Sequence, residues 1–332
     1  MLDSILTLLI PAALVLLFAW LAVRASRSKH ALVKWPGMLL SGLVGLLPLA
    51  ILGLVVYGLV TFKAVQANRP LYQIKADTSP AGLERGKYLV ENVMGCAGAC
   101  HSPQSGAPFS GNTEIIALGP AAIDFNAPNL TSDPETGLAA WSDAEIARAM
   151  REGVDREGHA LAVMPAFNYH VLSDADMAAI LGYLRALPPT QNQVKPFGAN
   201  TLGKALIASG ILIPPSLGKP ITSAQTTPPS GTVEYGAYLV SIAACRDCHK
   251  PNLAGGSGPG PAGDIPSANL TPGADMAQWS QADFLTAMHT GVRPDGTRIS
   301  PNMPYEEYGK MNDEDLAAIF KYLQTIPAVA SK

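Results

Sequence analysis

The stretch Cys245-Arg246-Asp247-Cys248-His249 decides the fold of this chain. Two cysteines separated by two residues and followed at once by a histidine form the pattern that attaches haem covalently. The two thiols add to the vinyl groups of the porphyrin, and the histidine reaches the iron from the same side. The sequence therefore predicts a c-type haem held by Cys245 and Cys248, with His249 as an axial ligand of its iron.

The segments around this motif occur twice in the chain. Gly86-Lys87-Tyr88-Leu89-Val90 recurs as Gly236-Ala237-Tyr238-Leu239-Val240. Matched segments in a constant order indicate a duplicated structural unit. We therefore predict two copies of one domain, at residues 81–190 and 231–332. The later matches are Asn129-Leu130-Thr131 with Asn269-Leu270-Thr271, Trp141-Ser142 with Trp279-Ser280, Met164-Pro165 with Met303-Pro304, and Tyr183-Leu184 with Tyr322-Leu323.

The first copy carries its own cysteine motif, which is one residue longer. In Cys96-Ala97-Gly98-Ala99-Cys100-His101 three residues separate the cysteines, where the standard pattern has two. A lost haem site with free thiols or a disulfide is the alternative interpretation. A central glycine tolerates unusual backbone angles and lets the segment bulge, and the copy keeps the rest of the repeat. We therefore predict a second covalent haem at Cys96 and Cys100, with His101 on its iron.

A methionine is the predicted second axial ligand of each haem. Met164 and Met303 each precede a proline in a loop between two predicted helices. Thioether sulfur is an established haem ligand, although a lone methionine more often fills a core. The competing histidines are His159, His170 and His289, whereas Met150 and Met288 match each other on helix interiors and are predicted to be core residues.

Two further pairs are candidates for the edge of the haem. Trp141 and Trp279 could border the porphyrin or donate to a propionate, with ordinary core packing as the alternative. Asn129 and Asn269 are interpreted as turn residues that can contact a propionate, not as glycan sites, although each begins an N-x-T sequence.

Each copy is predicted to be helical, with its first and last helices crossing. The middle helices are expected to begin at Ser142 and Ser280, each with an acid three residues later, which is capping-box spacing. Gly86 and Gly236 are expected at the crossings, where the absence of a Cβ allows Tyr183 and Tyr322 to pack closely. The sequence thus predicts an all-α fold in which long Gly- and Pro-rich connections and a bound cofactor complete the core.

Residues 1–62 are predicted to form two transmembrane helices. Ser4 to Val23 and Gly37 to Phe62 carry no charge, and about 20 apolar residues suffice to cross a bilayer. A buried core helix or a signal peptide is the alternative, but the start lacks the basic residues of a signal peptide. The loop at 24–36 is basic, and such loops stay cytoplasmic. Both termini and the haem domains are therefore expected in the periplasm of a bacterial inner membrane.

Composition and the remaining segments fit this organisation. The chain has 23 basic and 26 acidic residues, a net charge of −3, which argues against a nucleic-acid partner. Charged residues make up 15%, below the roughly 25% of ordinary soluble proteins. Four cysteines are too few for a disulfide scaffold. Residues 63–80 are predicted to be a tether, and residues 191–230 a Pro-rich linker.

The two cysteine motifs, the two Met-Pro pairs and the helices around them resemble class I cytochrome c in a tandem di-haem form. The run of Asn-Leu-Thr, Trp-Ser and Met-Pro is similar to that of cytochrome subunits of bacterial membrane-bound dehydrogenases. The resemblance covers about residues 81–328 and implies electron transfer without chemistry on a substrate. The longer spacing at Cys96 departs from the family pattern.

The resemblance implies membrane or periplasmic redox subunits as partners, with separate proteins as electron donor and acceptor. One version places the chain between a dehydrogenase or a quinol-oxidising partner and a respiratory acceptor. A second makes it the di-haem subunit of a haem–copper oxidase. A di-haem peroxidase is the alternative that is an enzyme, and a repeated methionine ligand argues against it because peroxide needs an open iron site. A haem-based sensor is a fourth, weaker idea.

Overall fold

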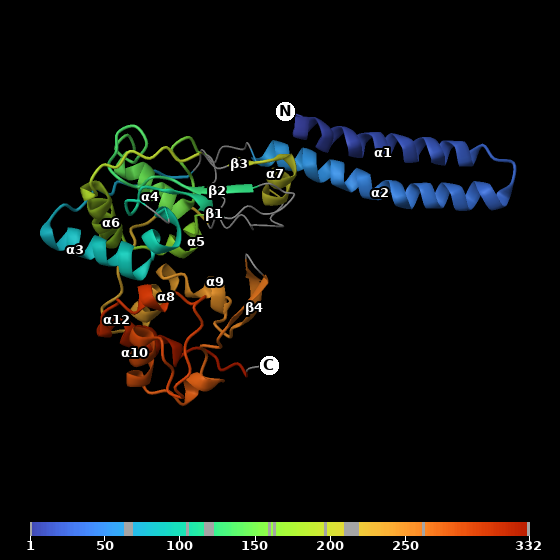
Figure 1. Ribbon diagram of the computed structural model, residues 1–332. Coiled ribbons are helices and arrows are strands. Elements are labelled where there is room, and N and C mark those ends of the chain that lie inside the picture. The colour runs from blue at the N-terminus through green and yellow to red at the C-terminus, as the bar shows by residue number, and fades with distance from the viewer. Residues whose placement is uncertain are drawn as a thin grey trace. The chain divides into compact units, whose positions relative to one another are not determined.

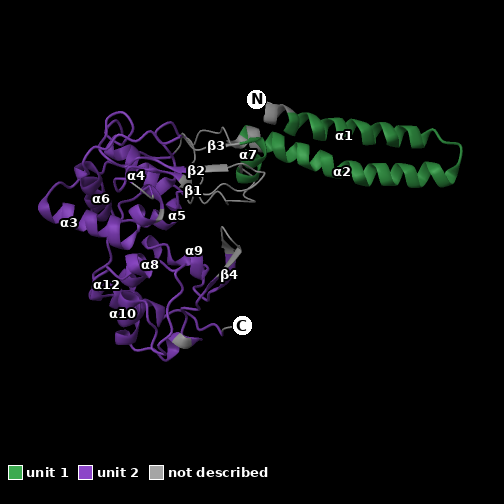
Figure 2. Ribbon diagram, viewed as in Figure 1, with its two compact units in different colours: residues 1–66, 116–125, 197–216 green, residues 67–115, 126–196, 217–332 purple. Residues whose placement is uncertain are grey.

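The computed structural model describes residues 2–62, 69–103, 106–115, 123–158, 161, 164–195, 198–208, 219–260 and 263–330. The chain divides into two compact units, which Figure 2 shows in green and purple. Unit 1 contains residues 1–66, 116–125 and 197–216, and unit 2 contains the remainder. Both cysteine motifs lie in unit 2, but residues 116–125 of the first copy belong to unit 1, so the unit boundaries do not follow the boundaries of the repeat.

Unit 1 is dominated by two long apolar helices that pack against each other (Figure 1). Helix α1 spans Leu2–Ser26 and helix α2 spans Ala31–Phe62. The segments Leu6–Ser26 and Ala31–Tyr57 are long and apolar enough to cross a membrane, and few of their side chains are buried. The prediction of two apolar N-terminal helices is confirmed.

The basic loop between these helices is flanked by aromatic side chains. The Arg24 guanidinium lies 5.5 Å from the ring centre of Trp20, and the Lys34 ammonium lies 5.8 Å from that of Trp35. Tryptophan and basic residues concentrate where a transmembrane helix meets the headgroups. The loop therefore has the composition of a membrane–water interface.

Part of the predicted linker has regular structure. Helix α7 (Thr201–Ala208) packs against α2, and strand β3 (Gly198–Ala199) pairs antiparallel with strand β2 (Ile123–Ala127). Residues 198–208, within the predicted Pro-rich linker over 191–230, therefore have regular structure. Its Pro214-Pro215 pair lies outside the described residues.

Unit 2 contains most of the first copy and all of the second, and the main helices of the two copies follow the same order. In the first copy the elements are α3 (Pro80–Tyr88), η1 (Leu89–Val93), η2 (Ala97–His101), β1 (Asn112–Ile115), α4 (Asp143–Glu152), α5 (Ala166–Tyr169) and α6 (Asp174–Ala186). In the second copy they are α8 (Val233–Ile242), α9 (Cys245–His249), β4 (Gly256–Gly260), β5 (Gly263–Ser267), η4 (Asp275–Ala277), α10 (Gln281–Thr290), α11 (Tyr305–Tyr308) and α12 (Asp313–Leu323). Helices dominate, as predicted. The short strands, including the antiparallel pair β4–β5, were not.

The predicted caps position the middle helix of each copy. Ser142 and Glu145 form a complete capping box at the start of α4, and Ser280 and Asp283 form one at the start of α10. Each box satisfies backbone N–H groups that the first turn of a helix otherwise leaves without partners. These two helix starts are fixed locally by sequence.

The two glycine crossings are almost identical in geometry. A Cβ added to Gly86 would lie 2.0 Å from the carbonyl oxygen of Ala179, and one added to Gly236 would lie 2.0 Å from that of Ala318. The Cβ atoms of Tyr183 and Tyr322 would each be 2.9 Å away. The predicted crossings of α3 with α6 and of α8 with α12 are thus confirmed.

Candidate functional site

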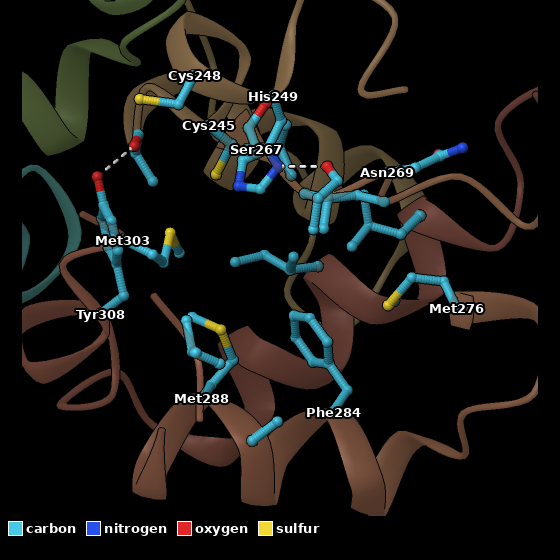
Figure 3. A pocket seen from close by; sticks show the side chains of 18 of the residues that line it. Cys245, Cys248, His249, Ser267, Asn269, Met276, Phe284, Met288, Met303 and Tyr308 are labelled. Atoms are coloured by element: carbon cyan, nitrogen blue, oxygen red, sulfur yellow. Dashed lines mark hydrogen bonds between the residues drawn. The ribbon is translucent and has the colours of Figure 1, made fainter. Parts of the chain in front are cut away.

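A cavity of about 670 Å³ lies in the second copy, between its cysteine motif and helix α10. Figure 3 shows Cys245, Cys248 and His249 along one wall, with Met303, Met288 and Phe284 facing them. Most of the remaining lining is aliphatic or aromatic. Volumes of 300–1,000 Å³ with apolar walls are typical of cofactor sites.

The cysteine motif forms one helical turn, α9, at the wall of this cavity. Ala244, directly before Cys245, is left-handed at φ 55°, and Lys250, directly after the turn, has φ 71°. Burial raises the pKa of the Cys245 thiol to about 12 and also raises that of Cys248. Both side chains border the cavity, where a porphyrin edge would meet them.

His249 is oriented by a backbone hydrogen bond. Its Nδ1 lies 2.8 Å from the carbonyl oxygen of Ala268, to which the ring N–H donates. Burial lowers the pKa of this imidazole, which favours the neutral form. A neutral ring that donates through Nδ1 keeps the Nε2 lone pair for a metal, and such a partner is typical of metal-binding histidines.

Other predicted residues also reach the second-copy cavity. Met303, Trp279 and Asn269 all border it. The Asn269 amide donates to the carbonyl oxygen of Val329 at 2.7 Å, and its Oδ1 accepts from the Thr271 backbone at 2.9 Å. Asn269 is thus a turn residue, as predicted.

The sequence interpretation did not identify three cavity-lining residues. Met288 was assigned to the core, but its side chain borders the cavity with Met303 (Figure 3). Helical spacing alone cannot separate a core-facing from a cofactor-facing position. Tyr308 and Arg293 also border the cavity. The Tyr308 position was visible in the repeat, because Tyr169 and Tyr308 each follow the Met-Pro methionine by five residues.

The donor set and the cavity suit a covalently attached porphyrin. Two thiols and an imidazole lie on one wall, a thioether lies opposite, and the walls between them are apolar. The Arg293 guanidinium suits the carboxylates that a porphyrin carries. The residues present therefore fit haem c.

The first copy arranges its cysteine motif in a wider turn. Residues Ala97–His101 form a π-helical turn, preceded by Gly95 in the left-handed region at φ 59°. A π turn accommodates one more residue than an α turn, which accounts for the extra residue between the cysteines. All four cysteines of the chain have free thiols in the structure.

The first-copy histidine repeats the environment of its counterpart. Nδ1 of His101 lies 2.9 Å from the carbonyl oxygen of Pro128, and burial lowers the pKa of the ring. Burial raises the pKa of the Cys96 thiol to about 12 and also raises that of Cys100. A backbone carbonyl therefore orients His101, and burial favours its neutral form, as at His249.

The other predicted residues of the first copy lie as follows. Met164 and Trp141 are each half-buried and pack against the hydrophobic core. The ring centre of Trp141 is 5.9 Å from the Arg156 guanidinium. Asn129 donates to the Thr190 carbonyl at 2.7 Å and accepts from the Thr131 backbone at 2.9 Å, so it is a turn residue like Asn269.

The competing histidines have other partners where the structure describes them. Nδ1 of His170 lies 3.0 Å from the carbonyl oxygen of Arg151. His289 has Nδ1 2.6 Å from the Gly309 carbonyl and Nε2 2.9 Å from Asp313. His159 lies outside the described residues. Iron ligation itself stays a prediction for all four proposed ligands.

Comparison with known proteins identifies the second copy. Residues 233–327 match the family model described as cytochrome c. This part of the chain is therefore a cytochrome c domain, and the family binds haem c covalently. The match contains the cavity and its complete Cys-x-x-Cys-His motif.

Three relatives are similar to most of this chain. One of the subunits of nicotinate dehydrogenase from Pseudomonas putida is 30% identical over 270 residues, which cover 75% of this chain and 22% of the relative. A diheme c-type cytochrome of Cereibacter sphaeroides is 28% identical over 254 residues, or 70% of this chain and 83% of the relative. The cytochrome c subunit of a quinone alcohol dehydrogenase from Gluconobacter oxydans is 27% identical over 287 residues, or 76% of this chain and 56% of the relative. This chain spans less than two thirds of the length of the first and third.

Proposed function

We propose that this chain is a membrane-anchored di-haem cytochrome c that carries single electrons from a dehydrogenase subunit to a respiratory acceptor. The cavity that joins Cys245, Cys248, His249 and Met303 carries the proposal. The matching Cys96–His101 turn and Met164 supply the second proposed haem site. Relatives named as dehydrogenase cytochrome subunits favour a dehydrogenase partner over a haem–copper oxidase.

The residues of each site hold a haem and tune it. Haem iron supplies reversible one-electron chemistry when it is bound, and histidine–methionine ligation raises its reduction potential. Cys245 and Cys248 tether the group, His249 is fixed through Ala268, and the apolar walls exclude water. A fixed ligand geometry and a dry site limit the rearrangement that accompanies a change of charge.

The head of the chain supports a membrane location. Helices α1 and α2 would cross the bilayer, and the basic residues Arg24, Arg27, Lys29 and Lys34 would keep their connection in the cytoplasm. The haem domains would then lie in the periplasm of a bacterial inner membrane, next to an integral or periplasmic redox partner.

Haem counting and ligand substitution test the two proposed sites. The purified protein is expected to contain two covalent haems by pyridine haemochrome assay and mass spectrometry. Met303→Ala and Met164→Ala are each expected to lower one haem's reduction potential and remove its share of the Met–iron absorption band. Met177→Ala, in the core of the first copy on α6, is the control, and it should leave both potentials and the band in place. An unchanged band in either ligand variant would refute that assignment.

A detergent pull-down of the native protein tests the partner. We expect a flavin, quinoprotein or molybdenum dehydrogenase subunit, which should reduce the cytochrome when given its substrate. Recovery of a haem–copper core subunit in its place would assign the chain to an oxidase. Peroxide turnover by the reduced protein would favour the peroxidase alternative.

A further inference from the structure

The two copies of the repeat meet through one set of contacts that is made twice. The Tyr88 hydroxyl in the first copy donates to Asp315 Oδ2 in the second at 2.7 Å, and the Tyr238 hydroxyl in the second donates to Asp176 Oδ2 in the first at 2.6 Å. Tyr88 and Tyr238 occupy equivalent positions, as do the two aspartates at the starts of α6 and α12. The interface therefore has an approximate two-fold relation between the copies, like the isologous contact of a symmetric dimer.

Further hydrogen bonds extend the same arrangement. The Tyr88 hydroxyl accepts from the backbone N–H of Asn312 at 3.2 Å, and the Tyr238 hydroxyl accepts from that of Ser173 at 3.4 Å. Arg85 in the first copy donates to the Tyr235 hydroxyl in the second at 3.3 Å, and the same guanidinium is held by Asp176 of its own copy at 2.9 Å. Each tyrosine thus joins the first helix of its own copy to the start of the last helix in the other.

The same approximate two-fold relation places the short helix that follows Met164 against the second copy, and the short helix that follows Met303 against the first. Helix α5 packs on α8, and helix α11 packs on η1. Asn168 donates to Asp247, within the second cysteine motif, at 2.8 Å. A Cβ on Gly98, within the first motif, would lie 3.1 Å from Glu307 Oε1. Asn168 and Glu307 are equivalent residues, so each cysteine motif touches the turn that follows the other copy's methionine.

Tyr169 and Tyr308, the next residues along these turns, lie between the two motifs. Tyr308 borders the second-copy cavity and donates to the Ala243 carbonyl at 2.8 Å, two residues before Cys245 (Figure 3). Burial raises the pKa of Tyr308, and nearby titratable groups, among them Cys245 of its own copy and Cys96 of the other, raise it further. Burial also raises the pKa of Tyr169, whose neighbours include Cys96 and Tyr308.

We propose that Tyr308 and Tyr169 form the route through which the two haem sites exchange electrons. The inference rests on the proposed di-haem function and deepens it. With haem bound at both sites, one electron would pass from the reduced site to the oxidised one, with no bond made and no proton moved. The tyrosines stay neutral and supply packed aromatic atoms, because tunnelling through a filled path is faster than across a gap of equal length.

The test measures exchange between the haems inside the holoprotein. Detergent-purified, fully oxidised protein receives less than one electron per chain from a flash-generated reductant. Redistribution between the haems is followed by transient absorption and by freeze-quenched EPR of the two ferric signals. Tyr308→Leu is expected to slow redistribution severalfold or more, because it replaces packed ring atoms on the route with a gap.

Conservative and control variants separate the route from general damage. Tyr308→Phe keeps the ring and is expected to exchange electrons at the wild-type rate. Tyr183→Leu removes a comparable half-buried tyrosine whose hydroxyl bonds Glu91 in its own copy, and it should leave the rate unchanged. If Tyr308→Leu does not retain haem, Tyr169→Leu provides the same measurement from the other side.

Two outcomes distinguish failure of the inference from failure of the proposed function. A wild-type exchange rate in Tyr308→Leu or Tyr169→Leu protein that holds two haems overturns the route and leaves the di-haem carrier intact. A single haem in the unmodified protein overturns the proposed di-haem function, and the route with it.

Discussion

The two cysteine turns differ in length but deliver their histidines to equivalent places. Cys96–His101 contains a π-helical turn and Cys245–His249 an α-helical one. After each turn the chain closes back in the same way: Gly111 N–H donates to the His101 carbonyl at 2.8 Å, and Gly255 N–H donates to the His249 carbonyl at 3.0 Å. The histidine and the backbone hydrogen bond to its carbonyl are therefore the same in both copies. The turn between the cysteines accommodates the one extra residue of the first copy.

Removal of the thiols should have the largest effect and tests whether both turns attach a haem. The double variant Cys245→Ala/Cys248→Ala and its counterpart Cys96→Ala/Cys100→Ala should each lose one covalent haem, because in the proposed protein each porphyrin would be attached covalently only through its own pair. Mass spectrometry of the denatured chains checks the number. If the first-copy variant retained every haem of the wild type, the longer turn would not be an attachment site.

A methyl group at either helix crossing should have the next largest effect. Gly86→Ala and Gly236→Ala place a Cβ against a backbone carbonyl, which cannot move aside as a side chain can. We expect each to lower the free energy of unfolding by about 3 kcal/mol, the upper range for overpacking. Denaturant titration checks this.

The matched control for the crossings is Gly42→Ala in α2, where an added Cβ meets nothing within 4 Å. It should leave the unfolding of unit 2 unchanged. Unequal losses for Gly86→Ala and Gly236→Ala would show that the two copies do not rely equally on their crossings.

The residue before each first cysteine gives a smaller, reciprocal test. Gly95 has φ 59° and Ala244 has φ 55°, a region that costs a non-glycine residue about 1–2 kcal/mol. Gly95→Ala should therefore destabilise the protein by about 1 kcal/mol. Ala244→Gly should stabilise it by roughly half that amount, since glycine's greater freedom in the unfolded chain offsets part of the gain.

Differential scanning calorimetry of both variants measures this pair. Ala97→Gly, in the first turn but outside the left-handed position, serves as a control for added glycine flexibility. If Gly95→Ala and Ala244→Gly changed the stability in the same direction, the left-handed backbone at these two positions would not explain the effects.

The smallest expected effect is a difference between the two copies in how their stability depends on pH. Arg151 in the first copy pairs with Asp174 at 2.8 Å, and His289 at the equivalent place pairs with Asp313 at 2.9 Å. Bonds to the Gly309 carbonyl and to Asp313 raise the pKa of His289. Its contribution is therefore complete below the ordinary histidine pKa and is lost as the pH rises through the raised value.

Because the His289 pair is exposed, its contribution should not exceed about 0.5 kcal/mol. Denaturant unfolding across neutral pH should show this loss in the wild type and not in His289→Gln. His289→Arg should make the second copy behave like the first, with no loss over that range. A loss that persists in His289→Gln would assign the pH dependence to another group.

Local rules account for what the sequence predicted well. The capping boxes at Ser142 and Ser280 depend on residues three apart, and the crossings at Gly86 and Gly236 follow from a repeated Gly-x-Tyr segment. The cysteine motif also joins neighbouring residues, so its chemistry is visible without a fold. Its assignment to a cytochrome c domain is supported for the second copy by the family match.

Features that depend on distant partners were missed. The β4–β5 pair forms in a Gly- and Pro-rich stretch without an alternating pattern, and α7 depends on packing against α2, far away in the sequence. Met288 was assigned to the core because helical periodicity does not reveal which face borders a cofactor. The Tyr88–Asp315 contact joins the two copies across more than two hundred residues, and no local pattern indicates it.

Burial of the thiols has a consequence for the order in which the protein is made. In the folded chain the pKa of Cys96 and of Cys245 is about 12, so at neutral pH almost none of either is the reactive thiolate. A folded domain would thus present Cys96 and Cys245 mainly as unreactive thiols, although Cys248 is exposed and the other cysteines are half-buried. We therefore expect the prosthetic group to be attached fastest before each domain closes, while the emerging polypeptide still exposes both cysteines to solvent.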